Sequence, residues 1–98
     1  MDKTVSFEFK MMPGYFLTVK ENRVYLLKYD GTMLFKKASS FIIHKDKYYK
    51  GYSVLECSMK PGYFLRHSYY QLVISRELRS ITFMMDSSFL ITTVCKYT

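Results

Sequence analysis

The pentapeptide Pro-Gly-Tyr-Phe-Leu occurs twice in this chain, at Pro13–Leu17 and again at Pro61–Leu65, 48 residues later. When the whole chain is shifted by the same distance without a gap, residues 5–50 pair with residues 53–98, and 13 of the 46 pairs are identical. A match that keeps its register over a whole unit indicates an internal repeat, which constrains the fold more than any local pattern does. We call residues 5–50 the first unit and residues 53–98 the second unit.

Short apolar or alternating runs, separated by turn residues about every 8–12 positions, predict strands in both units. Pro-Gly suits the middle of a tight turn, and Asp30–Gly31 is a hairpin-type turn signal. No stretch shows a helical period. The predicted strands are Val5–Phe9, the residues after Pro13–Gly14, Arg23–Lys28 and Ser39–His44 in the first unit, and Ser53–Cys57, Tyr63–His67, Gln71–Ser75 and Ser87–Thr93 in the second.

Four strands in a repeated unit of this length are typical of one lobe of a β-trefoil. We therefore expect an all-β, β-trefoil-like fold: one domain over residues 1–98, with lobe one at 5–51 and lobe two at 52–98. A trefoil has three lobes, so the third is absent from this chain. Two lobes alone would leave barrel edges unpaired and the core open to water. Either the sequence is a fragment, or another chain supplies the missing strands, or the two lobes close in an unfamiliar way; we favour the first two.

The net charge of +7 predicts a basic surface that attracts anionic partners. The Lys and Arg residues are dispersed along the chain, with local concentrations at Lys36–Lys37 and Lys45–Lys50. This dispersion makes an anionic polymer, such as a heparin-like chain or a nucleic acid, a less favoured partner. No apolar run is long enough to span a membrane, and the N-terminal residues contain no secretory apolar region. If the sequence is complete we expect a cytosolic protein, and otherwise its compartment is unknown.

The two cysteines, Cys57 and Cys95, carry no metal-binding spacing, and we predict no cofactor. Cys57 takes the place of Phe9 in the repeat, which favours a small buried apolar residue over a disulfide partner. Glu8 and Glu56 occupy equivalent positions in the two units. Their recurrence predicts a structural role, such as accepting hydrogen bonds from loop amides.

The sequence contains VSFEF followed by PGYFL in the first unit, and ECSMKPGYFLRH followed by FMMDSSFLI in the second. From Val5 to Thr98 this pattern resembles the arabinose-binding (AbfB-type) β-trefoil module of α-L-arabinofuranosidase B. The resemblance implies a β-trefoil whose lobes can each carry a shallow sugar pocket, while catalysis belongs to a separate domain. In that family, the His of an Arg-His pair and the Asp of a D-A-[ST]-F segment hydrogen-bond the hydroxyls of arabinofuranose.

These roles transfer to His67 and Asp86 in the second unit, with Arg66 and Tyr70 expected nearby. The first unit has Val19 and Ala38 at the two positions, and neither side chain can form a hydrogen bond. The resemblance thus implies one retained pocket, in lobe two. Two structural alternatives remain open: His67 caps a turn at a strand end, and Asp86 bonds the backbone of a loop.

Our leading functional hypothesis is a non-catalytic module that binds a furanose or a related glycan. The rival is a structural or protein-interaction trefoil with vestigial sugar sites, whose open barrel is completed by another chain or by self-association. The loss of polar residues at Val19 and Ala38 supports the rival. We predict no enzymatic activity, because His44 and His67 with their nearest acids form no recognised nucleophile–base set.

Overall fold

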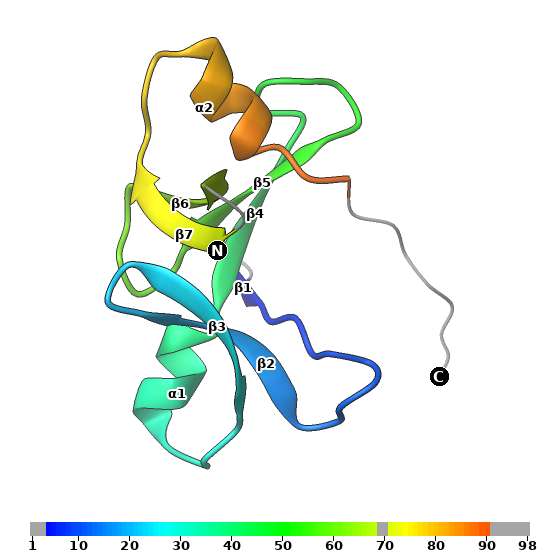
Figure 1. Cartoon of the computed structure of the whole chain (residues 1–98), viewed down its shortest axis with the longest axis vertical. Helices are drawn as coiled ribbons and strands as arrows, with labels where there is room; N and C mark the ends of the chain where they lie inside the picture. The colour runs from blue at the N-terminus through cyan, green and yellow to red at the C-terminus, as the bar shows by residue number, and fades with distance from the viewer. Residues whose placement is uncertain (1–3, 69–70, 91–98) are drawn as a thin grey trace.

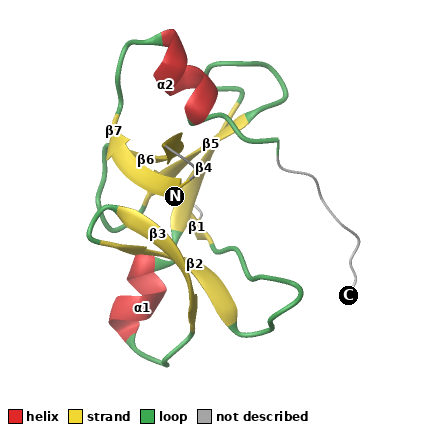
Figure 2. Ribbon diagram, viewed as in Figure 1, coloured by secondary structure: helices red, strands yellow, loops and turns green. Residues whose placement is uncertain are grey.

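The computed structural model describes residues 4–68 and 71–90. Within these residues the chain forms seven antiparallel strands and two short helices, and the strands make a curled half-barrel (Figures 1 and 2). The elements are β1 (Thr4–Val5), β2 (Tyr15–Lys20), β3 (Arg23–Lys28), α1 (Met33–Ala38), β4 (Phe41–Lys45), β5 (Ser53–Cys57), β6 (Tyr63–Ser68), β7 (Gln71–Arg76) and α2 (Ile81–Asp86). In Figure 1 the two helices lie at opposite ends of the molecule, with the strands between them.

The strand order in the sheet is β1-β4-β5-β6-β7-β3-β2, and every pairing is antiparallel. Strands β2 and β3 form one hairpin, and β6 and β7 form the equivalent hairpin in the same register. The two hairpins contact each other where Arg23 pairs with Val73 and the Ile74 N–H donates to the Asn22 carbonyl at 2.9 Å. The two repeat units therefore share one sheet.

The repeat seen in the sequence is also present in the backbone pairing. Val5 pairs with Phe41 in the first unit, and Ser53 forms a bridge with Phe89 in the second. The bridge between Glu8 and Phe16 likewise recurs between Glu56 and Phe64. All these pairs are related by the 48-residue shift, which confirms that both units follow one plan as far as Phe89. The last three residues of the predicted strand Ser87–Thr93, from residue 91, lie outside the described residues.

Both Pro-Gly turns form as the sequence predicts. The Tyr15 N–H donates to the Met12 carbonyl at 3.1 Å, and Gly14 has a φ of +90°. In the second unit the Tyr63 N–H donates to Lys60 at the same distance, and Gly62 has a φ of +87°. Pro before a positive-φ Gly is the sequence pattern of a type II turn.

The predicted structural role of the two recurring glutamates is confirmed. The Gly14 N–H donates to Glu8 Oε2 at 2.7 Å, and the Gly62 N–H donates to Glu56 Oε2 at 2.8 Å. Each carboxylate therefore holds the Pro-Gly turn against the strand segment that precedes it.

The two helices correct our expectation of a chain without helix. Each has six residues, too few for a 3.6-residue period to show in the sequence. Each begins after a capping hydroxyl: Thr32 accepts from the Phe35 N–H, and Ser80 accepts from the Phe83 N–H, both at 3.1 Å. Side-chain capping of this kind starts a helix where no periodic pattern announces one.

Asp30–Gly31 does not form the predicted hairpin turn. The Asp30 carboxylate instead accepts from the Thr32 N–H at 2.9 Å and leads the chain into α1. The hairpin between β2 and β3 turns at Glu21 and Asn22, whose φ angles of 53° and 65° are both positive. Two positive φ angles are those of a type I′ turn, which matches the twist of the flanking strands.

The outer strands of the sheet are joined by the segment that follows β1. The Leu17 N–H donates to the Phe7 carbonyl at 3.0 Å, and the Phe9 N–H donates to the Tyr15 carbonyl at 2.8 Å. Contrary to our expectation of unpaired barrel edges, the beginning of β2 is therefore paired.

The main core is buried at its centre and partly exposed around it. Its buried members are Val19, Phe41, Leu55, Cys57, Leu65 and Ile74, and the partly buried side chains packed against them are Val5, Phe7, Leu17, Val24, Ile43, Tyr63, Leu72 and Phe89. Cys57 is fully buried, as predicted, and this burial raises the pKa of its thiol. Cys95 lies outside the described residues.

Candidate functional site

A groove of about 390 Å³ lies in the first unit, between the β2–β3 hairpin and α1. Its lining is Thr18, Val19, Lys20, Leu27, Asp30, Thr32, Leu34, Phe35, Ala38 and Met59. Val19 and Ala38, the equivalents of His67 and Asp86, both belong to it. Two positions that are 19 residues apart in sequence thus converge on one hollow.

The same positions in the second unit carry a different set of side chains. Four apolar residues of the first-unit groove correspond to polar residues: Val19 to His67, Leu27 to Ser75, Leu34 to Thr82 and Ala38 to Asp86. Ser75 and Thr82 were missed in the sequence analysis because they belong to no motif. They are found by taking the residues that line the first-unit groove and adding 48 to each residue number.

Asp86 is the last residue of α2, and the structure pairs it with Arg66 on β6. Arg66 Nη2 lies 2.7 Å from Asp86 Oδ2, and the side chains are 16% and 31% exposed. The guanidinium carbon lies 5.1 Å from the centre of the Phe83 ring. Arg66 Nε is buried and has no hydrogen-bond partner among the described residues. Asp86 is therefore a helix-end residue held by an ion pair, which corrects the alternative of a backbone-bonded loop residue.

His67 follows Arg66 on β6 and is exposed. Its ring centre lies 5.2 Å from that of Phe89. Successive side chains of a strand point to opposite faces, so Arg66 and His67 leave β6 on opposite sides. The structure thus brings Arg66 to Asp86 and His67 to Phe89, and within the described part of the chain no hydrogen bond joins His67 to Asp86. Tyr70 lies outside the described residues.

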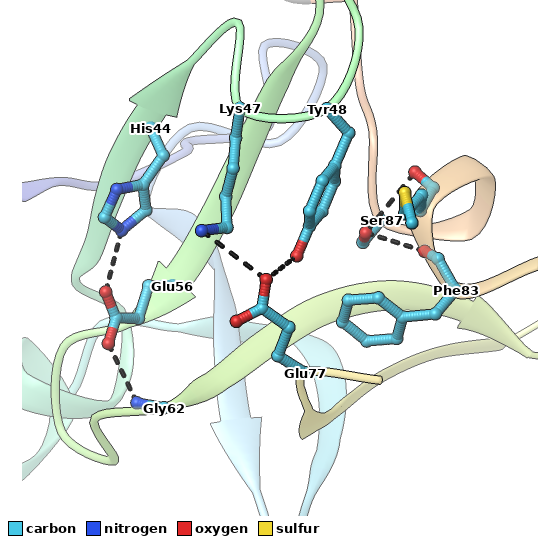
Figure 3. A network of polar contacts seen from close by, with 9 residues as sticks. His44, Lys47, Tyr48, Glu56, Gly62, Glu77, Phe83 and Ser87 are labelled. Carbon is cyan, nitrogen blue, oxygen red and sulfur yellow. Dashed lines mark hydrogen bonds and ion pairs between the residues drawn. The ribbon is translucent and has the colours of Figure 1, made fainter. Parts of the chain in front are cut away.

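His44 and Glu56 form a second polar contact in the same half of the molecule (Figure 3). His44 Nε2 lies 2.7 Å from Glu56 Oε1, while the other carboxylate oxygen accepts from the Gly62 N–H. Burial by itself raises the pKa of the Glu56 carboxyl. The bonds from Gly62 and His44 outweigh burial and hold this pKa below its usual value.

Tyr48 and Lys47, in the loop between β4 and β5, both reach Glu77 (Figure 3). The Tyr48 hydroxyl donates to Glu77 Oε2, and Lys47 Nζ lies 3.5 Å from the same oxygen. Partial burial, together with the bond to Glu77, raises the pKa of the Tyr48 hydroxyl, which therefore stays protonated at neutral pH. This network fixes the loop that connects the two units onto the second unit.

The described residues contain no group of three His, Cys, Asp or Glu side chains arranged to hold a metal ion. None of the helices within residues 4–68 and 71–90 has the length and apolar character needed to cross a membrane.

A family model described as the alpha-L-arabinofuranosidase B (ABFB) domain matches residues 1–91. Two solved structures share the fold: a GH54 α-L-arabinofuranosidase soaked with a cyclic sulfate inhibitor, and a mutant GH54 α-L-arabinofuranosidase soaked with 4-nitrophenyl α-L-arabinofuranoside. Each gives a TM-score of 0.79 at 15% identity, over 89% of this chain and 19% of the other. This chain thus spans about a fifth of the length of those proteins. No curated protein matches it at a significant level.

Proposed function

Because the chain belongs to the AbfB family, the domain family of alpha-L-arabinofuranosidase B, we propose that it is a non-catalytic module that binds a furanose-containing glycan. The proposed binding site is centred on the Arg66–Asp86 pair of the second unit. His67, which leaves β6 on the other side and lies beside Phe89, contributes to it only if its ring turns toward Asp86 when the sugar binds, and Tyr70 is assigned by sequence alone. The division into lobe one (5–51) and lobe two (52–98) is part of this proposal.

The observation that supports the second unit is the change in groove chemistry between the two units. Val19 and Ala38 are apolar residues of the first-unit groove, whereas their equivalents are His67 and Asp86. A sugar is held by several hydrogen bonds to its hydroxyls together with apolar contact. Such donors and acceptors stand at the second-unit positions and are missing from their first-unit equivalents.

The ion pair of Arg66 with Asp86 suits this role. It fixes the carboxylate at the end of α2, so that little side-chain entropy remains to be lost when a hydroxyl donates to it. A single shallow site of this kind binds weakly, with a dissociation constant on the order of 1 mM, equivalent to about −4 kcal/mol. Because the proposal assigns a single site to the described residues, no avidity from a second site is expected in the titration below.

The test is a titration of the ¹⁵N-labelled chain with methyl α-L-arabinofuranoside, followed by NMR. We expect chemical-shift changes at β6 and α2, around His67 and Asp86. The variants His67→Ala and Asp86→Asn should each weaken binding at least tenfold while the rest of the spectrum stays unchanged. Lys20→Ala, in the first-unit groove, is the matched control and should leave the affinity as it is.

Two results would overturn this assignment. One is the absence of any shift at saturating furanoside. The other is binding that His67→Ala leaves intact or that Lys20→Ala removes, because the sugar would then occupy the first unit. Strong weakening by salt would point instead to an anionic polymer as the natural ligand.

The second candidate function is protein interaction, in which another chain completes the open barrel. The observation in its favour is that eight apolar side chains packed against the main core are only partly buried in the described part of the chain. In a complete barrel these side chains would be covered, and covering apolar surface is the main favourable term in association. Light scattering over a concentration series distinguishes the outcomes: a defined dimer or trimer supports this function, and a monomer at every concentration rules out self-completion.

A further inference from the structure

A hollow of about 360 Å³ lies in the second unit, between the loop that joins β4 to β5 and the C-terminal end of α2. Its walls are almost entirely apolar, and its lining is Tyr49, Tyr52, Met85 and Ser88. Its three largest side chains are all exposed: Tyr49 by 38%, Tyr52 by 43% and Met85 by 63%. Two aromatic rings and a thioether thus border one solvent-accessible hollow.

The loop that carries the two tyrosines is held in shape by its own backbone. The Asp46 N–H donates to the Tyr52 carbonyl at 3.0 Å, and the Tyr52 N–H donates to the Tyr49 carbonyl at 3.1 Å. The Gly51 N–H donates to Asp46 Oδ1 at 2.6 Å. These bonds position both tyrosines without involving their side chains.

Tyr48 fixes the same loop onto the second unit. Its ring packs against the buried cluster of Val54, Phe64 and Phe83, and it stands edge-on to Phe83 with the ring centres 6.3 Å apart. Its hydroxyl donates to Glu77, which follows β7, as Figure 3 shows. Because the loop is fixed in this way, the neighbouring tyrosines lose little conformational freedom when a ligand covers them.

The hollow adjoins the proposed glycan site at the end of α2. Met85 lines the hollow, and the next residue, Asp86, is the carboxylate that Arg66 holds. The Ser88 hydroxyl donates to the Met84 carbonyl at 2.6 Å, and its oxygen can still accept a hydrogen bond. The end of α2 thus offers a charged acceptor at one residue and, at the residues beside it, an apolar surface with one polar atom.

We propose that this hollow binds the next sugar ring of the glycan whose furanose occupies the Arg66–Asp86 site. The ring lies with its C–H groups on Tyr49 and Tyr52 and donates one hydroxyl to Ser88 Oγ. Binding sites for small molecules combine apolar walls with a few polar groups in this way. Tyrosine suits such a contact, because it offers a large, rigid surface at a small loss of conformational entropy. The ligand is then an oligosaccharide rather than a single terminal furanose, and this inference rests on the proposed function.

The test compares two probes on the whole ¹⁵N-labelled chain by NMR: methyl α-L-arabinofuranoside, which has one ring, and α-1,5-linked arabinotriose, which has three. Both should shift the signals of β6 and α2, and the triose should in addition shift those of Tyr49, Gly51 and Tyr52. Contact with two aromatic rings should make the triose bind about fivefold more tightly than the methyl furanoside.

Three variants show whether the tyrosine rings cause this difference. Tyr52→Ala removes one wall of the hollow and leaves the backbone bonds of the loop in place. It should abolish the advantage of the triose and leave the affinity for the methyl furanoside unchanged, whereas Tyr52→Phe should retain the advantage. Tyr25→Ala is the matched control, since Tyr25 lies on β3 of the first unit and is 42% exposed. It should change neither affinity.

The proposal fails if the triose binds no more tightly than the methyl furanoside, or if Tyr52→Ala leaves the advantage of the triose intact. The proposed function survives either result as long as the methyl furanoside binds and Asp86→Asn weakens that binding.

Two further outcomes separate the hollow from the proposed function. If neither probe binds at millimolar concentration, the proposed function fails and this proposal fails with it. If the triose shifts the loop signals alone, and does so equally in Asp86→Asn, the hollow binds sugar by itself and the assignment of the Arg66–Asp86 site is wrong.

Discussion

The two units share the hydrogen bonds that hold their turns and helix ends, and they differ in the side chains beside their helices. Glu8 and Glu56 each hold a Pro-Gly turn, and Thr32 and Ser80 each cap a helix. The buried hydroxyls that follow the helices also match, since Ser39 donates to the Phe35 carbonyl and Ser87 to that of Phe83, at 2.8 and 2.7 Å. By contrast, four apolar residues of the first-unit groove are replaced by polar residues at the equivalent positions of the second unit.

This contrast separates residues that hold the fold from residues available for binding. A side chain that completes a turn or a cap is needed in both units, because each unit must satisfy the same backbone groups. A side chain that contacts a ligand is needed where that ligand binds. Residues that are identical at equivalent positions of the two units therefore indicate a role in the fold. Positions that are polar in one unit and apolar in the other indicate a candidate binding site.

The largest difference we expect is between the helix phenylalanines. Phe83 is fully buried and packed under Tyr48, so Phe83→Ala should lower the free energy of unfolding by about 3–5 kcal/mol. Phe35 borders two hollows, and Phe35→Ala should cost about 3 kcal/mol, the lower end of that range. Urea unfolding of both variants measures the difference. Equal losses would mean that Tyr48 does not improve the packing of the second unit.

The next difference concerns the two glutamates. Glu56 is 16% exposed and contacts both Gly62 and His44, so Glu56→Ala should cost about 1–3 kcal/mol in unfolding free energy. Glu8 bonds Gly14 at an exposed position, and Glu8→Ala should cost less. The variant His44→Ala is the control: it should reproduce part of the Glu56→Ala loss. If Glu8→Ala lowers the free energy of unfolding more than Glu56→Ala does, the two glutamates do not play equivalent roles in holding their Pro-Gly turns.

The helix caps should respond alike. Thr32→Ala and Ser80→Ala each remove one hydrogen bond to a helix N–H, and each should cost about 1 kcal/mol. Chemical denaturation with a conservative control, Ser80→Thr, measures this. A loss confined to one unit would show that the other helix is held by packing alone.

The smallest effect should appear in the dependence of stability on pH. The pKa of the Glu56 carboxyl is lowered in the folded chain, so its ionised form stabilises the fold. This stability is fully present above the unfolded pKa, about 4.3 for a glutamate, and is lost as pH falls through the lower folded value. The stability difference between the wild type and Glu56→Gln should therefore shrink on acidification. A difference that stays constant down to pH 2 would contradict the assignment.

The sequence predicted those parts of the molecule that depend on local pattern or on the repeat. The strand Arg23–Lys28, the two type II turns and the glutamate clamps were all found this way. The helices were missed because a six-residue helix that starts at a capping hydroxyl has no periodic signature.

At the candidate site, sequence motifs named His67 and Asp86, whereas the pairing of Asp86 with Arg66 needed the structure. Side-chain partners that are 20 residues apart depend on how α2 meets β6, and no local pattern encodes that contact. Tyr48 was missed for a related reason, since the shift pairs it with Lys96 and does not indicate that its ring packs against Phe83.

The position of Tyr48 also decides at which residue a fragment should begin if the second unit is to be moved into another protein. Its ring completes the second unit, yet it lies before residue 52, the limit that the repeat suggests. A graft that starts at Tyr52 leaves this ring behind in the donor protein, whereas one that starts at Asp46 carries it along. For gene fusion, the cut point that keeps this ring with the second unit lies directly after β4.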